Sequence, residues 1–152
     1  MKNFGDYNLE ELLELLKTSS QNIYTQLGSG HNEKIYHKSL KYELDCLNIM
    51  SDMERHVIVN YIDSKGNEHF LESERIDTYI FGKDYDIILE LKAISGSLSE
   101  RENQQIKKYF RELKKEGKKI KLGIIINFCQ PNSKEIKNMI EFKQVINDDF
   151  SD

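Results

Sequence analysis

The sequence has no long hydrophobic run and very little cysteine. No apolar stretch approaches the ~18 residues that a membrane-spanning helix needs, and the N-terminal residues lack the apolar core of a secretion signal. The two cysteines, Cys46 and Cys129, lie far apart in apolar surroundings, which favours reduced core thiols over a disulfide or a zinc site. They are too few for a four-cysteine iron–sulfur cluster. We therefore expect a cytoplasmic protein that contacts no membrane.

Positive charge is not in excess either. The formal net charge is −4, with acidic residues concentrated near the N-terminus and in a tail over 148–152. One segment nevertheless concentrates basic side chains: Lys107, Lys108, Arg111, Lys114, Lys115, Lys118, Lys119 and Lys121. This segment is either a solvated helix face or a surface that contacts phosphate groups, and the pattern alone leaves both interpretations open.

What the sequence does have is helical periodicity at three places. Its 152 residues are enough for a single domain with a hydrophobic core, which we expect to extend over 1–152. Leucines at helical spacing predict an amphipathic helix over 8–27, which dominates an N-terminal region 1–27. A second apolar stripe predicts a helix over about 32–47. The capping-box pattern Ser99–Glu102 predicts a third, which ends near Glu116.

Apolar runs between these helices predict strands. Two runs, over 57–62 and 68–71, are separated by a turn and predict a hairpin, and further strands are expected over 76–81, 87–93 and 121–128. The last strand is reached through a helix, so we expect it to pair in parallel. Residues 134–147 fit either a helix or a final strand. The predicted class is α/β, with a mixed central sheet flanked by helices.

Three charged residues interrupt these apolar strands. Side chains two residues apart share one face of a strand, so Glu90 and Lys92 point the same way, and a hairpin through Gly82 brings Asp77 alongside. A purely structural interpretation is a cross-strand salt bridge on a solvated face of the sheet. However, charges on a strand this apolar are costly unless they are paired or bind a metal, and two carboxylates beside an ammonium suit phosphodiester hydrolysis.

These residues resemble a known nuclease signature. Asp77 followed by Glu90-Leu91-Lys92 is similar to the PD-(D/E)xK nuclease superfamily, although Ile76 stands where the superfamily's name has proline. The segment 30–36 resembles the GxxExxY signature of one subfamily. Arg75-Ile76-Asp77, Gln105 with Tyr109, and the strand 122–128 agree in order, so the similarity covers about residues 23–147. The resemblance implies a restriction-endonuclease-like PD-(D/E)xK core.

The resemblance also implies roles for the site residues. Asp77, Glu90 and the carbonyl of Leu91 are expected to bind Mg²⁺ or Mn²⁺, and Glu33 to complete the metal site or support it from outside. Lys92 would orient the attacking water or stabilise charge on the phosphate. The resemblance also places Gln105 among the catalytic residues, where it would orient Lys92 or the DNA, because its helix is expected to pack over the metal site. From the residues alone, Glu33 could equally cap its helix, and Arg75 could contact phosphate or pair with a carboxylate such as Glu90.

The expected function is therefore metal-dependent hydrolysis of DNA. The Gln-x-x-x-Tyr pattern resembles RecB-type nuclease domains, which favours an exonuclease or an end- or structure-selective enzyme acting on single strands or duplex ends. The alternative is a non-catalytic nucleic-acid-binding or protein-interaction module on a nuclease fold. A homodimer, formed through the first helix or an edge strand, fits either function. The expected nucleic-acid contacts are Arg75, Lys107, Lys108, Tyr109, Arg111, Lys114, Lys115 and Lys118.

Overall fold

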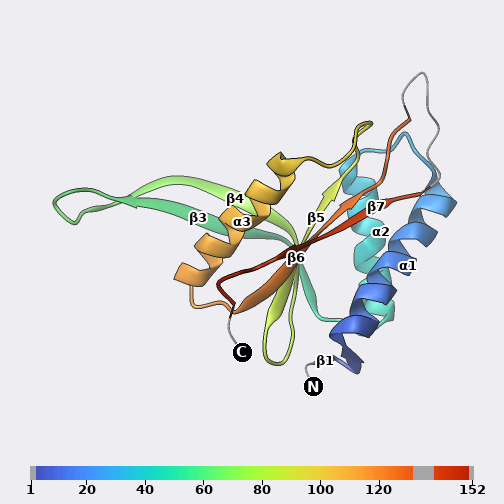
Figure 1. Cartoon of the computed structure of the whole chain (residues 1–152), viewed down its shortest axis with the longest axis horizontal. Coiled ribbons are helices and arrows are strands. Elements are labelled where there is room, and N and C mark those ends of the chain that lie inside the picture. The colour runs from blue at the N-terminus through green and yellow to red at the C-terminus, as the bar shows by residue number, and fades with distance from the viewer. Residues whose placement is uncertain (1–2, 132–138, 151–152) are drawn as a thin grey trace.

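The computed structural model describes residues 3–131 and 139–150, and its centre is a five-stranded mixed sheet in the order β3-β4-β5-β6-β7 (Figure 1). The predicted α/β class, a mixed sheet flanked by helices, is confirmed. Along the chain the elements are β1 Asn3–Phe4, β2 Tyr7–Asn8, α1 Leu9–Leu27, α2 Glu33–Cys46, β3 Ser51–Ile62, β4 Glu68–Ile80, β5 Asp86–Lys92, α3 Glu100–Lys115, β6 Ile120–Asn127 and β7 Glu141–Ile146.

Helices cover both faces of the sheet. The apolar stripes of α1 and α2 pack with Ile87, Leu89 and Leu91 on one face, whereas α3 packs with Ile88 and Ile125 on the other. Alternation along β5 places successive side chains on opposite faces, so one strand supplies both halves of the core. Burial on both faces explains why this strand is almost continuously apolar.

Local signals set the helix boundaries close to the predicted ones. The side chain of Asn8 accepts a hydrogen bond from the Glu11 N–H at 2.9 Å, and the Glu11 carboxylate accepts one from the Asn8 N–H at 3.1 Å. The predicted capping box of α3 is present, since Glu102 accepts from the Ser99 N–H at 2.9 Å. These bonds satisfy amide groups that the first turn of a helix leaves unpaired.

The strands differ from the prediction in two places. The runs 68–71 and 76–81 belong to one thirteen-residue strand, β4, and β3 begins at Ser51 rather than at Val57. The segment before Val57 is mostly polar, so it shows no apolar run. Pairing with the buried inner end of β4 makes it a strand nonetheless. The parallel pairing predicted for β6 is confirmed by the register Leu89↔Ile124.

The end of the chain and the cysteines complete the comparison. Residues 141–146 form the strand β7, while the part of the ambiguous segment over 132–138 lies outside the described residues. Cys129 is buried as expected, but the expectation of a core position for Cys46 is wrong, because this residue ends α2 on its exposed side. Within the described residues, no helix is long and apolar enough to cross a membrane.

The outer parts of β3 and β4 project beyond the helices as a two-stranded arm (Figure 1). We define the arm as residues 58–71. Its strands pair through Tyr61↔His69 and Ile62↔Glu68, and its turn is held by backbone N–H groups that donate to Asp63 at 2.9 Å. The inner parts of the same two strands lead back into the core, and the inner part of β4 carries Asp77 of the predicted site.

Candidate active site

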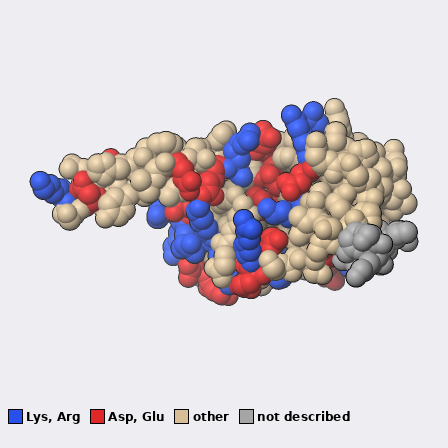
Figure 2. Space-filling view, turned by 90° about the horizontal axis from the view of Figure 1, so that it is seen from above, with Lys and Arg blue, Asp and Glu red and all other residues tan. Residues whose placement is uncertain are grey.

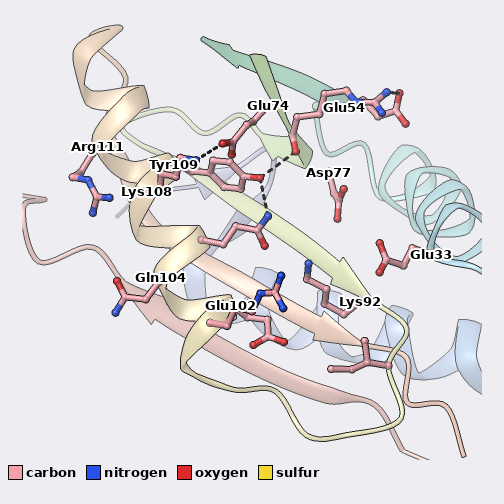
Figure 3. Close-up of a pocket in the computed structure, with 14 residues that line it drawn as sticks. Glu33, Glu54, Glu74, Asp77, Lys92, Glu102, Gln104, Lys108, Tyr109 and Arg111 are labelled. Atoms are coloured by element: carbon pink, nitrogen blue, oxygen red, sulfur yellow. Dashed lines mark hydrogen bonds and ion pairs between the residues drawn. The ribbon is translucent and has the colours of Figure 1, made fainter. Parts of the chain in front are cut away.

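A cleft of about 1010 Å³ opens between the sheet and α3, and most of its lining is charged (Figure 3). It receives side chains from α2, β3, β4, β5 and α3. Its acidic residues are Glu33, Glu54, Glu74, Asp77 and Glu102, and its basic residues are Arg75, Lys92, Arg101, Lys108 and Arg111. Carboxylates and cations are thus interspersed over the lining of the cleft. Such a lining suits a ligand that combines phosphate groups with a metal ion.

Asp77 and Glu90 occupy neighbouring strands where the β4–β5 ladder ends. The last paired residues are Thr78 and Leu89, so Asp77 and Glu90 are the first residues beyond the ladder on the two strands. Side chains take over the hydrogen bonding there: the Asp77 N–H donates to Glu90 Oε1 at 3.2 Å, and the Leu91 N–H donates to Asp77 Oδ2 at 2.8 Å. These bonds fix both carboxylates at the same place.

Burial strongly perturbs Glu90. The residue is 4% exposed, and burial, followed by the negative charge of Asp77, raises its pKa well above 4.5. The Asp77 N–H and the Lys92 ammonium act in the opposite direction and lower that pKa. Two carboxylates this close repel each other when both are ionised, so the site favours either a shared proton or a bound cation.

Lys92 supplies the positive charge of the cluster. It lies two residues after Glu90 on the same strand face, and its charge lowers the pKa of both Glu90 and Glu33. Figure 3 shows Lys92, Asp77 and Glu33 directed toward a common space. Within the described residues Lys92 makes no ion pair at contact distance, so its ammonium remains available to a ligand.

Glu33 reaches this space from the first turn of α2. The cap of that helix is Asn32, whose side chain accepts from the Ile35 N–H at 3.3 Å, so Glu33 is not needed for capping. Although the residue as a whole is exposed, its carboxyl end is partly desolvated, which together with Asp77 raises its pKa, against the effect of Lys92 and the Ala93 N–H. The carboxyl group therefore lies with the strand carboxylates.

Gln105 and Tyr109 lie one turn apart on the face of α3 that borders the cleft. Gln105 Nε2 donates to Tyr109 Oη at 3.1 Å, and Tyr109 Oη donates to the carbonyl of Arg75 at 3.3 Å. Burial, and then the charge of Glu90, raises the pKa of Tyr109. This pair attaches α3 to β4 and places the amide of Gln105 at the edge of the cleft.

Two of the predicted phosphate-contacting residues are held by carboxylates. Arg75 pairs with Glu54 at 3.4 Å, so of the two alternatives left open for this residue the structure shows a carboxylate partner, and that partner is not Glu90. Lys108 pairs with Glu74 and, at 3.3 Å, with Glu72. The bond to Glu74 raises the pKa of Lys108, which keeps it charged.

The basic segment does not form one surface. Its side chains spread around α3 because consecutive residues turn by about 100° in a helix of 3.6 residues per turn. Lys108 and Arg111 line the cleft, whereas Lys107 lies in a hollow beside Asp148 and Asp149. The remaining predicted contacts also lie elsewhere, Lys114 and Lys118 in a hollow near Asn147 and Lys115 beside the arm.

The structure adds cleft residues that the sequence did not single out. Arg101 and Gln104 share the cleft face of α3 with Lys108 and Arg111, at the helical spacing of three to four residues that would have revealed them. Glu54 could not be found in this way. It lies in β3 and has a positive φ of 56°, so the regular alternation of a strand does not predict that its side chain lines the cleft. Among the described residues, Arg101 and Arg111 make no ion pair.

Known proteins place this arrangement in a family. Residues 10–139 match the model of the PD-(D/E)XK nuclease superfamily, and the chain belongs to this superfamily. No curated protein sequence matches the chain. Among solved structures, the one titled "Crystal structure of SSO0001" is similar, with a TM-score of 0.52 and 14% sequence identity. The similarity covers 89% of this chain and 65% of that one, and at this identity it concerns the fold alone.

Membership defines the class of protein as the PD-(D/E)XK nucleases. Nucleases of this superfamily generally use divalent metals. Among the described residues, no group of three or more His, Cys, Asp or Glu side chains is placed to hold a metal ion. The donor set nevertheless fits one, because Asp77 and Glu90 offer carboxylate oxygens, which hard cations prefer, and a cation would relieve their mutual repulsion.

Proposed function

We propose that this protein is a metal-dependent deoxyribonuclease, an exonuclease or an end- or structure-selective enzyme, related to the GxxExxY subfamily. The observation that carries the proposal is the convergence of Asp77, Glu90 and Lys92 at the end of the β4–β5 ladder, with Glu33 directed to the same space. A purely structural role explains this convergence poorly, because it buries a carboxylate beside a second one of the same charge.

The proposed metal ligands are Asp77, Glu90 and the Leu91 carbonyl, with Glu33 completing the site, and the metal is Mg²⁺ or Mn²⁺. When bound, such an ion supplies a Lewis acid and lowers the pKa of a coordinated water. The role of the buried sheet around Glu90 is to hold its carboxylate in one position and away from bulk water. Leu91 has a second role, because its N–H orients Asp77.

The catalytic role proposed for Lys92 depends on its positive charge. Its ammonium lies among the carboxylates without a contact partner in the described residues, so a phosphate oxygen can take that place. A fixed cation there stabilises the negative charge that develops on the phosphate during attack by water. Gln105 is proposed to orient Lys92 or the DNA from the cleft edge, once its amide exchanges the bond with Tyr109 for one with the substrate.

DNA is proposed as the substrate, held mainly by the cations that are free of carboxylates in the cleft. Arg101 and Arg111 have this role, whereas Arg75 and Lys108 must first leave Glu54 and Glu74. Phosphate contacts of this kind give affinity without reading base sequence, so we propose cleavage that does not depend on sequence.

The test is cleavage of labelled single-stranded, duplex and branched DNA by the full chain, with Mg²⁺, with Mn²⁺ and with EDTA. We expect metal-dependent cleavage that starts from ends or at branches, and none with EDTA. Time courses that shorten the strand progressively indicate an exonuclease, and discrete internal products near a branch indicate a structure-selective enzyme. RNA of the same sequence is tested in parallel, which shows whether the enzyme cleaves DNA, RNA or both.

The second candidate is a non-catalytic nucleic-acid-binding module. It is favoured by the finding that no complete set of three metal ligands is assembled among the described residues. The same cleavage assay, together with DNA binding and calorimetry of Mn²⁺ binding, separates the two functions. DNA binding without cleavage under any metal condition, and without calorimetric binding of Mn²⁺, would identify the binding module and reject the enzyme.

A further inference from the structure

The arm exposes more apolar surface than any other part of the described chain. Five large hydrophobic side chains on it are exposed: Ile58 53%, Tyr61 57%, Ile62 65%, Phe70 65% and Leu71 59%. In Figure 2 the arm extends from the body, mostly uncharged except near its tip and its base. Apolar patches of this kind mark interaction surfaces, because a monomer gains nothing by leaving them in water.

One side of the arm is also the edge of the sheet. Among the described residues β3 pairs only with β4, so the other side of this twelve-residue strand has unpaired backbone groups. The irregularity in the outer ladder lies on β4, where Leu71 is skipped between Phe70 and Glu72, so residues 56–62 of β3 stay regular. A regular strand edge is a template for pairing with another strand.

The opposite edge of the sheet shows how such an edge is usually protected. β7 has six residues and carries Glu141 and Lys143, and charged side chains on a short edge strand discourage pairing. In β3 the seven residues 56–62 include no Asp, Glu, Lys, Arg or Pro. The protection present on one edge is thus missing on the other.

We propose that the outer half of β3 is a dimer interface, which pairs in antiparallel fashion with β3 of a second copy about an axis at Val59. In this pairing Val59 lies opposite the partner's Val59. A residue of one copy lies opposite a residue of the other when their two residue numbers add up to twice 59. Positions 56–62 then meet only uncharged residues, with Val57 opposite the partner's Tyr61. At each end Arg55 lies opposite the partner's Asp63, so the first charged pair has opposite signs.

The charge on the arm favours a second copy over nucleic acid. Within residues 58–71 there are two acidic side chains, Asp63 and Glu68, and one basic side chain, Lys65. Such a segment has no surplus of cations to neutralise phosphates, which is the main source of affinity for nucleic acid. Two copies instead bring the apolar side chains of their β3 edges beside each other and join their sheets into one.

The test is sedimentation equilibrium of the full chain and three variants, Val59→Lys, Val59→Glu and Phe70→Lys. The parent is expected to dimerise. Val59→Lys and Val59→Glu each place two like charges opposite each other at the axis, which raises the dimer Kd by at least about tenfold. Phe70→Lys is the matched control, since it adds the same charge to the arm on the strand that is not at the edge.

Mixing the two Val59 variants makes the test independent of folding damage. A heterodimer places lysine opposite glutamate, so the 1:1 mixture is expected to recover association that neither variant shows alone. A monomeric parent at about 100 µM, well above a typical micromolar Kd, would overturn the proposal. So would a mixture that fails to associate, or a control variant that loses the dimer equally. None of these results depends on cleavage, so the interface stands or falls apart from the nuclease function.

Discussion

The inner and outer halves of the β3–β4 hairpin are built from the same two strands but have opposite chemistry. The inner half carries Glu54, Glu74, Arg75 and Asp77, all of which line the cleft. The outer half, the arm, has mostly uncharged side chains and exposes large apolar ones. The same two strands pair in both halves, so the difference lies mainly in their side chains.

The contrast shows where a strand tolerates charge. In the inner half each cation has a carboxylate nearby, Arg75 with Glu54 at 3.4 Å, and the buried Glu90 receives a backbone N–H. Those contacts offset part of the cost of removing charges from water. The arm carries few charges, and its Asp63 is bonded at the tip by His69 at 2.7 Å and by backbone N–H groups. We infer that the inner half meets a charged ligand and the outer half an uncharged strand.

The largest effect is expected from Lys92→Ala. If Lys92 stabilises charge in the transition state, its removal lowers the single-turnover cleavage rate by about 10²–10³-fold, as for other lost electrostatic groups. DNA affinity and Mn²⁺ affinity should change little. Lys65→Ala, which removes a lysine from the tip of the arm, is the control. Parental cleavage by the Lys92 variant would reject the role assigned to this residue.

The next effect concerns the stability of the metal-free protein. Because the pKa of Glu90 is raised in the fold, the folded state retains its proton over a pH range in which the unfolded state has lost it. The free energy of unfolding therefore decreases as the pH rises above about 4.5, until the pH exceeds the folded pKa. Glu90→Gln should remove this dependence and raise the Tm at pH 7, by about 2–4 °C for each kcal/mol.

Thermal denaturation in EDTA at a series of pH values measures this effect. Mn²⁺ should raise the Tm of the parent, and less so at low pH, because the ligand must lose its proton to bind the metal. The Gln variant should gain little from Mn²⁺. A parent whose Tm in EDTA is the same from pH 5 to pH 8 would contradict the buried, proton-retaining state of Glu90.

A smaller effect is expected from the free arginines of the cleft. Replacing both Arg101 and Arg111 by Gln should reduce the slope of log K against log salt by about 1.8 for duplex and about 1.4 for single strands, which is two phosphate contacts. The comparison is a variant with Lys114, Lys115 and Lys118 changed to Gln, which lie outside the cleft. Filter binding across a salt series measures both. A larger loss of slope in the lysine variant would place the DNA on the far side of α3.

The smallest effect is expected from opening the Arg75–Glu54 pair. Exposed ion pairs contribute about 0–1 kcal/mol to stability, so Glu54→Gln should leave the Tm nearly unchanged. It frees Arg75 and removes one negative charge from the cleft, so DNA affinity should rise modestly, with a slope steeper by about 0.7–0.9. Asp52→Asn is a matched control, since Asp52 holds Arg55 at the same 3.4 Å outside the cleft. Equal gains in both variants would indicate a general charge effect.

Local patterns in the sequence were sufficient for much of the fold. Leucine spacing marked α1 and a capping box marked the start of α3, apolar runs marked β5 and β6, and the helix between them implied their parallel pairing. Alternation along β5 was enough to place Glu90 and Lys92 on one face. All of these signals act over a few residues, which is why a sequence shows them without knowledge of the fold.

Contacts between segments that are distant in the sequence could not be predicted from such local signals. The polar start of β3 has no strand signal of its own and depends on pairing with β4. The partner of Arg75 is a residue of β3 with a positive φ, and the cations of α3 look like one group in the sequence but point to different sides of the helix. Cys46 has an apolar sequence context yet lies outside the core.

By itself, the sequence determined the helices, the apolar strands and the charged residues that break their pattern, because periodicity and capping are local properties. Only the tertiary structure decided which of those charges meet: that Glu33 joins Asp77 and Lys92, that Arg75 and Lys108 are already paired, and that the arm leaves an uncharged edge in water. The reason is physical, since burial, repulsion between carboxylates and ion pairing depend on distances across the sheet, and the order of residues does not contain those distances until the chain has folded.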